Sequence, residues 1–277
     1  MTNRLRHRLE DLLSIERKAL VTFITAGDPA PAVTVPALHA LVAAGADVLE
    51  LGVPFSDPEA EGPAIQAASE RALAHGITLR QTLDLVAEFR GTDQDTPVVL
   101  MGYLNSVLRM GEEQFAAAAK EAGVDGLIMV NLPPEEGQVL QQALTGVGID
   151  LIYLIAPTTT PERQATILAR CGGFVYYVSL KGITGAGNVE PRQVSQEVAA
   201  IQAQTELPVM VGFGIKNGET AAQIAAAADG VVVGSALVQL LGDGASADPD
   251  AEELAERLAA MASLVRDIRA ALDGLSG

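Results

Sequence analysis

Cysteine and histidine are scarce in this chain. Its 277 residues include one cysteine, Cys171, and three histidines. A single cysteine excludes an internal disulfide and a zinc cluster built on several thiolates, and it is typical of proteins from a reducing compartment. Three histidines are too few to predict a histidine-based metal site. We therefore expect no metal in this chain.

Long apolar runs are also missing. No segment approaches the roughly 20 consecutive apolar residues that a membrane-spanning helix requires. Residues 1–16 are charged throughout and lack the apolar stretch of a signal peptide. We therefore expect a soluble, cytoplasmic protein that does not associate with membranes.

Positive charge is in short supply. The 18 lysines and arginines face 35 aspartates and glutamates, which gives a net charge of -17. The negative electrostatic field of such a protein repels the phosphates of nucleic acid, so we expect no nucleic-acid partner. It also repels a small phosphorylated substrate. A phosphate site in this chain must therefore rely on local backbone N–H groups.

What the sequence does contain is a regular alternation of short apolar runs and longer amphipathic stretches. This spacing is typical of βα units that form a parallel sheet, and most of the runs are apolar on both faces, as buried parallel strands are. In a chain of this length, eight such units predict an α/β fold, a single (β/α)8 or TIM barrel in which residues 1–277 form one domain. The eight expected strands are residues 19–26, 47–55, 97–103, 126–131, 150–156, 174–180, 207–214 and 230–234.

Several helices can be predicted from apolar spacing. Residues 112–122 and 135–144 are expected helices between strands. An extra N-terminal helix is expected to close the bottom of the barrel with one apolar stripe, and a last helix is expected to start at Pro249. The stripe of the first helix is Leu5, Leu9, Leu12 and Leu13, and that of the last is Leu254, Leu258, Met261 and Leu264 or Val265.

Glu50 lies in the second predicted strand, where the side chains alternate between two faces. Leu49 and Leu51 are expected to face the surrounding helices, so Glu50 points into the barrel. Catalytic groups of such barrels lie at the carboxyl ends of strands. A carboxyl group that loses water there has a raised pKa, which suits a proton shuttle. The alternative is a structural carboxylate paired with a neighbour.

The loop after this strand is long for a βα connection. Residues 54–63 contain three prolines and a second carboxylate, Glu61. Long ordered loops at this rim tend to be functional, so Glu61 is a candidate to fold back over the mouth of the barrel. The alternative, which is commoner for acids on loops, is a solvated side chain.

Glycines cluster after the last three predicted strands. Residues 181–188 contain three glycines, which predicts either a lid over the substrate or a flexible connection. Gly212 and Gly214 follow the seventh strand, and Gly234 and Ser235 open a short helix after the eighth. The N–H groups of such a helix favour a phosphate, and these two loops are the usual phosphate cradle of the fold. Tight turns alone are the alternative for either pair.

Residues 49–58, LELGVPFSDP, resemble the tryptophan synthase alpha subunit family. The resemblance covers about residues 17–238. It includes FITAGDP at 23–29, GP and IQ at 62–66, VLMGY at 99–103, GITG at 182–185, GFG at 212–214 and GS at 234–235.

This resemblance implies an enzyme, a carbon–carbon lyase of tryptophan biosynthesis. Its reaction is the retro-aldol cleavage of indole-3-glycerol phosphate to indole and glyceraldehyde 3-phosphate. Glu50 matches the general acid/base that protonates the indole ring carbon. Glu61 matches the second acid, which accepts a hydrogen bond from the indole N–H. The matches to substrate-binding positions are Phe23, Met101, Tyr176 and the lid residue Thr184, and the matches to the phosphate cradle are Gly185, Gly214, Gly234 and Ser235.

The chain departs from the family pattern at several positions. The second acid is usually aspartate, and the extra methylene of Glu61 moves its carboxylate by about one C–C bond length. This change affects the expected rate of the reaction more than the resemblance to the family. Asn131 stands where aspartate is usual, which keeps hydrogen bonding and removes a charge.

The resemblance also implies a partner. The family works as an α2β2 heterotetramer in which a beta subunit carries pyridoxal phosphate, so no cofactor is expected in this chain. Pro54, Asp57 and Asn105 are expected on rim loops that face the beta subunit. The loops after the second and sixth strands are expected to carry the allosteric coupling between the two sites.

Two other functions remain open. One is a non-catalytic or weakly active alpha-type subunit that binds ligand and activates the beta subunit. The other is a Schiff-base aldolase that uses Lys181 as its nucleophile. The second is disfavoured, because a glycine-rich loop offers none of the desolvation that makes a lysine nucleophilic.

Overall fold

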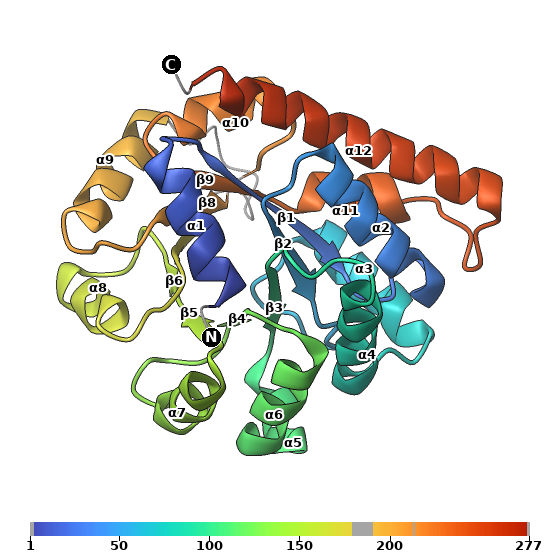
Figure 1. Cartoon of the computed structure of the whole chain (residues 1–277), viewed down its shortest axis with the longest axis horizontal. Coiled ribbons are helices and arrows are strands. Elements are labelled where there is room, and N and C mark those ends of the chain that lie inside the picture. Colours follow the sequence, from blue (N-terminus) through green and yellow to red (C-terminus); the bar gives the residue numbers. More distant parts are fainter. Residues whose placement is uncertain (1–2, 179–190, 213, 276–277) are drawn as a thin grey trace.

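Parallel strands form one sheet that curves into a barrel, with helices around it (Figure 1). The computed structural model describes residues 3–178, 191–212 and 214–275. In the sheet the described strands are ordered β5-β4-β3-β2-β1-β9-β8-β7-β6. Their bounds are β1 Ala19–Thr25, β2 Val48–Gly52, β3 Val98–Gly102, β4 Gly126–Met129, β5 Asp150–Ile152, β6 Leu154–Ile155, β7 Val175–Val178, β8 Val209–Gly212 and β9 Gly230–Val233.

The predicted (β/α)8 barrel is confirmed, with one difference. Eight strands were expected, and the fifth is divided at Tyr153 into β5 and β6. β5 pairs with β4, and β6 pairs with β7. These two pieces stand at opposite ends of the strand order yet follow one another in the chain, so the sheet returns on itself. Several strands are shorter than predicted; β2, for example, spans Val48–Gly52 where residues 47–55 were expected.

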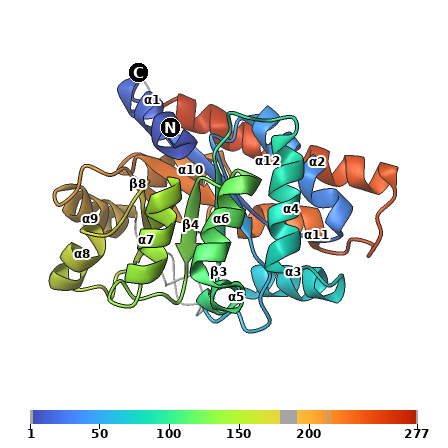
Figure 2. The same cartoon turned by 60° about the horizontal axis from the view of Figure 1, so that its bottom comes forward.

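Helices cover the outside of the sheet in chain order (Figure 2). Their bounds are α1 Arg4–Ser14, α2 Pro31–Ala44, α3 Pro63–Ala74, α4 Leu79–Arg90, α5 Leu104–Met110, α6 Glu112–Ala122, α7 Gln138–Val147, α8 Pro161–Leu168, α9 Pro191–Gln202, α10 Gly218–Ala225, α11 Ser235–Gly242 and α12 Ala251–Asp273. Among the described residues, none of these helices combines the length and apolarity needed to cross a membrane.

Side-chain alternation along the strands produces two buried apolar clusters. Leu49 and Leu51 of β2 belong to the larger cluster, between the sheet and the helices. Val48 of the same strand belongs to the smaller one, inside the barrel, with Val99 from β3. The period of two therefore separates an outer core from an inner core, as predicted.

Helix α1 closes the bottom of the barrel. Leu5, Leu9 and Leu12 are buried in the inner cluster. Leu13 was expected on the same stripe, but it is 43% exposed. Adjacent residues of a helix point about 100° apart, so the neighbour of a buried Leu12 turns toward solvent.

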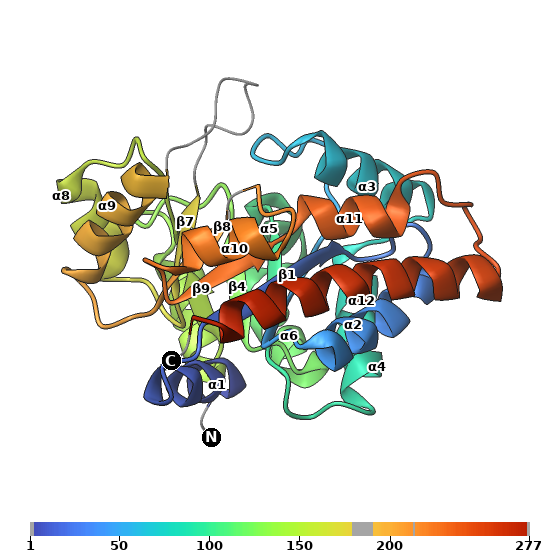
Figure 3. The ribbon, with the colours of Figure 1, turned by 90° about the horizontal axis from the view of Figure 1, so that it is seen from above.

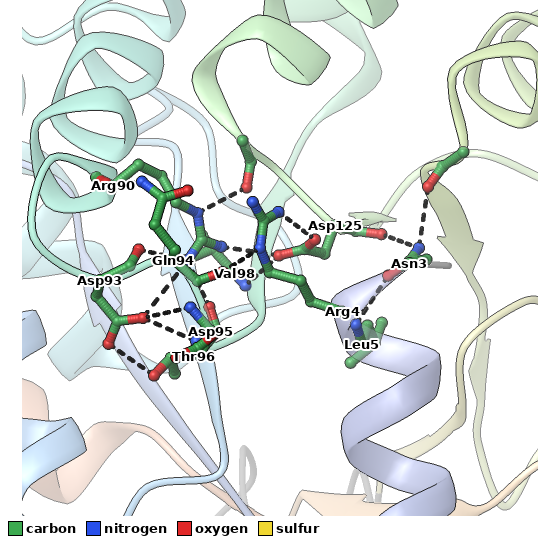
Figure 4. A network of polar contacts seen from close by, with 12 residues as sticks. Asn3, Arg4, Leu5, Arg90, Asp93, Gln94, Asp95, Thr96, Val98 and Asp125 are labelled. Atoms are coloured by element: carbon green, nitrogen blue, oxygen red, sulfur yellow. Dashed lines mark hydrogen bonds and ion pairs between the residues drawn. The ribbon is translucent and has the colours of Figure 1, made fainter. Parts of the chain in front are cut away.

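Polar contacts fasten α1 to the amino ends of distant strands (Figure 4). Arg4 pairs with Asp125 at 2.9 Å, and Asn3 donates to the Asp125 carbonyl at 2.7 Å. Arg90 reaches the other Asp125 oxygen at 2.8 Å. Arg6 pairs with Asp150. The Asp125 carboxylate also bonds to the sheet itself, because it accepts a hydrogen bond from the Val98 N–H at 3.0 Å.

Two predicted helices begin later than expected. The α7 helix starts at Gln138, since residues 133–137 form turns in which the N–H groups of Glu136 and Gly137 bond to Pro133 and Pro134. The last helix starts at Ala251, because Asp250 accepts hydrogen bonds from two N–H groups of its first turn. Pro249 therefore precedes the cap. Met261 and Val265 are fully buried, whereas Leu254, Leu258 and Leu264 are half-buried.

Candidate active site

The end of the barrel opposite α1 holds the candidate site. Figure 3 shows α1 at one end and α3, with the loop that leads into it, at the other. A cavity of about 750 Å³ opens there, at the carboxyl ends of the strands. The predicted residues that line it are Phe23, Glu50, Met101, Tyr176, Gly214, Gly234 and Ser235. The structure thus brings together an acid, aromatic side chains and glycines from six strands or the residues that follow them.

Glu50 points into this cavity from β2. Its register partners are Phe23 on β1 and Val99 on β3. The side chain is 1% exposed, and neither carboxylate oxygen has a hydrogen-bond partner among the described residues. Glu50 is therefore not a paired structural carboxylate. Loss of water, and secondarily the charge of Glu61, raise its pKa to about 8.

A buried carboxyl group of this kind holds its proton at neutral pH. It can then donate that proton to a bound molecule and take one back, because a pKa near the working pH serves both steps. An unpartnered carboxyl inside a cavity is also costly to the fold. These properties favour a catalytic group over a structural one.

Glu61 folds back from the loop, as predicted. It is 9% exposed and accepts a hydrogen bond from the hydroxyl of Tyr103, which in turn accepts one from the Ala60 N–H at 3.0 Å. Burial raises the pKa of Glu61, and the bond from Tyr103 partly opposes this rise. The Glu61 carbonyl is held by the Gln66 amide at 2.8 Å. Glu61 is thus an ordered acid and not a solvated loop residue.

Tyr103 is a site residue that sequence reasoning missed. It follows β3 directly, and its ring stacks on that of Phe55 with 4.7 Å between the ring centroids. Both rings line a small side cavity with Glu61, and this side cavity shares Phe23 and Met101 with the main one. The available signal was position, because Tyr103 is the first residue past the carboxyl end of a barrel strand.

Two glycines make room for the aromatic side chains of the cavity, and their role was also missed. A Cβ atom on Gly52 would lie 2.6 Å from Cζ of Phe23. A Cβ on Gly212 would lie 2.6 Å from the hydroxyl oxygen of Tyr176. No real side chain tolerates such distances, so glycine at these strand ends allows both rings to turn inward. Burial, together with the charge of Glu50, raises the pKa of Tyr176 well above its usual value.

The residues of the predicted phosphate cradle that the structure describes line the same cavity as Glu50. Gly214 has φ +42°, and a Cβ on it would meet nothing within 4 Å, so its backbone is open to a ligand. Gly234 caps α11, whose first residue is Ser235. Helix N-termini and glycine backbone present N–H groups that suit an anion. Lys216, just beyond Gly214, also lines the cavity and was not singled out from the sequence.

The remaining predicted residues fall into two groups. Lys181, Thr184 and Gly185 lie outside the described residues. Of the rim residues, Pro54 is buried, whereas Asp57 and Asn105 are exposed.

Asn131 organises the rim beside Asn105. Its Oδ1 accepts a hydrogen bond from the Leu104 N–H at 2.8 Å, and its amide donates to Asn105 Oδ1 at 3.3 Å. An aspartate would keep the first bond but lose the second, because it has no N–H to donate. Elsewhere in the described ranges, no group of three histidine, cysteine, aspartate or glutamate side chains could hold a metal ion.

The whole chain is similar to proteins of known function. The model of the family described as tryptophan synthase alpha chain matches residues 9–271. The tryptophan synthase alpha chain of Alkalilimnicola ehrlichii is 52% identical over 99% of this chain and 98% of its own length. That of Burkholderia mallei is 51% identical over 98% and 97%. The crystal structure of tryptophan synthase subunit alpha from Legionella pneumophila superposes with a TM-score of 0.90 at 46% identity, over 99% of this chain and 100% of that one.

Proposed function

The chain belongs to the tryptophan synthase alpha chain family and is a lyase that cleaves indole-3-glycerol phosphate to indole and glyceraldehyde 3-phosphate, and we propose that Glu50 and Glu61 carry the proton chemistry of this cleavage. The observation that carries the proposal is the Glu50 carboxyl group, which is 1% exposed and unpartnered inside the cavity. A non-catalytic role is not favoured, because both acids are ordered and face neighbouring cavities.

In the proposed mechanism, neutral Glu50 donates its proton to the indole ring carbon that bears the glycerol phosphate chain. Positive charge then develops on the ring nitrogen. The Glu61 carboxylate accepts a hydrogen bond from the ring N–H and stabilises this charge. The two acids therefore differ in role because they differ in surroundings, one unpartnered and one held by Tyr103.

The bond between the ring carbon and the chain breaks in the next step. The Glu50 carboxylate takes the proton of the hydroxyl group on the adjacent chain carbon, which becomes the aldehyde of the product. The electrons of the broken C–C bond return to the ring and restore aromatic indole. Glu50 ends the cycle protonated, as it began, and its pKa of about 8 suits both transfers.

The other cavity residues are proposed to position the substrate. Phe23 and Met101 contact the indole ring, and Tyr176 lies beside Glu50, whose charge influences the tyrosine pKa. The amides of Gly214, Gly234 and Ser235 bind the phosphate. We propose that Thr184 and Gly185 complete the site from the loop after β7.

Glu61 in place of the usual aspartate is compatible with activity in this proposal. The longer side chain is held by the Tyr103 hydroxyl, and its backbone by Gln66. Two restraints on one loop residue limit the orientations that the extra methylene would otherwise allow.

Membership of the family implies a beta subunit as partner. We propose an α2β2 heterotetramer in which pyridoxal phosphate belongs to the beta subunit, this chain carries no cofactor and its 277 residues act as one domain in the cytoplasm. Asp57 and Asn105 are exposed on the rim that holds the site, which supports contact with the partner there. Pro54 is proposed to shape the same loop from within, and coupling between the two active sites is proposed to pass through the loops after β2 and β7.

The experiment that tests the acid assignment compares the unchanged protein with Glu50→Gln. Release of indole from indole-3-glycerol phosphate should fall at least about a thousandfold, because amides cannot transfer the proton. Binding of the substrate should change little, since glutamine has nearly the same shape. Persistent indole release would reject Glu50 as the acid. Borohydride treatment with substrate tests the aldolase alternative, because a covalent adduct at Lys181 would overturn the non-covalent mechanism.

A further inference from the structure

The cavity extends beyond the predicted phosphate cradle. Its outer part is lined by Ile215, Lys216, Gln239, Leu240 and Leu264. Lys216 is the one lysine or arginine among the described residues that line this cavity. The same cavity holds Glu50, and Glu61 lies in the small cavity beside it.

The backbone places Lys216 close to the cradle. Gly214 is two residues earlier, so the two Cα atoms lie at most about 7.6 Å apart, and a lysine side chain spans a comparable distance. Ile215, between them, is 4% exposed and packs into the outer core. On the other side, the Lys216 N–H donates to Thr220 Oγ1 at 3.1 Å, at the cap of α10. The main chain is thus held on both sides of the lysine, while its side chain is exposed.

The charge of Lys216 has no partner in the part of the chain that the structure describes. The arginines at the bottom of the barrel are paired: Arg4 and Arg90 with Asp125, Arg6 with Asp150, and Arg269 with Asp47. Within residues 3–178, 191–212 and 214–275, the Lys216 ammonium has no hydrogen bond or ion pair. In a chain with 35 acidic residues and a net charge of -17, Lys216 brings positive charge to a cavity that no other described lysine or arginine lines.

A phosphate dianion needs such a charge here. Backbone N–H groups give a phosphate hydrogen bonds and partial charge but no full positive charge. The protein's net charge and the nearby Glu61 carboxylate repel the dianion. A lysine supplies a compact point charge of the kind often used for phosphates.

We propose that Lys216 is the cation of the phosphate site, pairing with the phosphate of indole-3-glycerol phosphate while the amides of Gly214, Gly234 and Ser235 bind its oxygens. This inference rests on the proposed cradle and adds a side chain that determines substrate affinity. Lys216 is a binding residue and takes no part in proton transfer. It also attracts the anionic substrate toward a cavity that the overall charge would otherwise make unfavourable.

The test measures kcat and KM for cleavage of indole-3-glycerol phosphate at low and high salt. Lys216→Gln should raise KM about tenfold at low ionic strength and leave kcat within about twofold. The difference should shrink at high salt, because salt screens exposed charges. Lys216→Arg should recover most of the affinity. The matched control is Lys120→Gln, an exposed lysine on α6, which removes the same net charge far from the cavity.

Competition with two inhibitors separates a phosphate role from a general change in the cavity. Inhibition by glycerol 3-phosphate should weaken about tenfold in Lys216→Gln, whereas inhibition by the uncharged indole-3-propanol should not change. Equal KM values for the unchanged protein and Lys216→Gln would overturn the proposal. An increase in KM that Lys120→Gln reproduces would also overturn it, because the effect would then come from net charge alone.

A further variant distinguishes failure of this inference from failure of the cradle. Gly234→Ala places a methyl group beside the amides of the α11 N-terminus, where its nearest neighbour would be the Phe23 ring at 3.5 Å. Weaker glycerol 3-phosphate inhibition in Gly234→Ala, but not in Lys216→Gln, would retain the cradle and reject Lys216. No change in either variant would reject both.

Discussion

Buried carboxylates pair with arginine at the bottom of the barrel and beside the end of β1, where Asp28 pairs with Arg71 at 2.6 Å, but not in the cavities that hold Glu50 and Glu61. Asp47, Asp125 and Asp150 at the bottom are 2–3% exposed, and each forms an ion pair with at least one arginine. Glu50 and Glu61 at the top are 1% and 9% exposed, and neither has a cationic partner among the described residues. Carboxylates that are buried to a similar degree therefore differ in their surroundings, and the difference is the presence or absence of a neighbouring cation.

The comparison between Asp47 and Glu50 shows how this works. Burial raises the pKa of both groups. At Asp47 the Leu20 N–H and the Arg269 guanidinium oppose the rise, whereas at Glu50 the charge of Glu61 adds to it. The bottom of the barrel therefore keeps charges that hold strands together. The top keeps a proton for chemistry, at a cost in stability.

The largest effect is expected from breaking a pair at the bottom. Asp125→Ala leaves Arg90 buried without its partner and removes the acceptor of the Val98 N–H. Loss of one member of a buried pair costs about 3–5 kcal/mol, so the free energy of unfolding should fall by that amount. Urea denaturation measures it. At a temperature where the variant is folded, kcat should stay near that of the unchanged protein, and a large fall in kcat would show that the two ends are not separate.

An effect of opposite sign is expected at the top. The carboxyl group of Glu50 has a pKa near 4.5 in the unfolded chain and about 8 in the folded protein. The folded state thus holds a proton that the unfolded chain releases between these values. The stability that this proton provides is fully present below about pH 4.5 and is lost as the pH rises through about 8, by up to about 1.4 kcal/mol per pH unit.

Glu50→Gln removes this dependence. The variant should therefore become more stable than the unchanged protein as pH rises from 5.5 to 8.5, and the gap should grow with pH. Urea unfolding at several pH values measures the gap. The comparison between the two ends would fail if the gap were constant, because Glu50 would then bind protons equally in both states.

The smallest effect is expected from Tyr103→Phe, which removes the hydroxyl that donates to Glu61 and keeps the ring that stacks on Phe55. Loss of one hydrogen bond to a charged group corresponds to about 1.5–3 kcal/mol, and the Gln66 amide still holds the backbone of Glu61. We expect kcat to fall about fivefold to tenfold, with a small change in stability. Steady-state kinetics measure it, and an unchanged kcat would mean that Tyr103 does not position the second acid.

Local patterns predicted much of this molecule. Alternation along β2 placed Glu50 inside the barrel and Leu49 and Leu51 outside it, because a period of two follows from strand geometry alone. Glycines at the last two strand ends were also predicted to lie at the site, and Gly214 and Gly234 line the same cavity as Glu50. The first residue of a helix was harder to predict where two residues could mark its start, as at Pro249 and the capping residue Asp250.

Long-range contacts could not be predicted from one sequence. Tyr103 and Glu61 are 42 residues apart, and Arg4 and Asp125 are 121 apart. Nothing in the local pattern around either residue specifies its partner. The space that Gly52 and Gly212 leave for Phe23 and Tyr176 depends likewise on neighbouring strands. The division of the fifth strand at Tyr153 arises from pairing with β4 on one side and β7 on the other.

Helix α1 is synthesised long before the residues against which it packs. Its contacts at Asp125 and Asp150 lie 121 to 147 residues further along the chain. At a synthesis rate of about 5–20 residues per second, the ribosome completes these residues roughly 6 to 30 seconds after α1 is made. During that interval Leu5, Leu9 and Leu12 have no barrel to enter. The apolar face of the helix that closes the finished protein therefore stays uncovered until the fifth strand has been made.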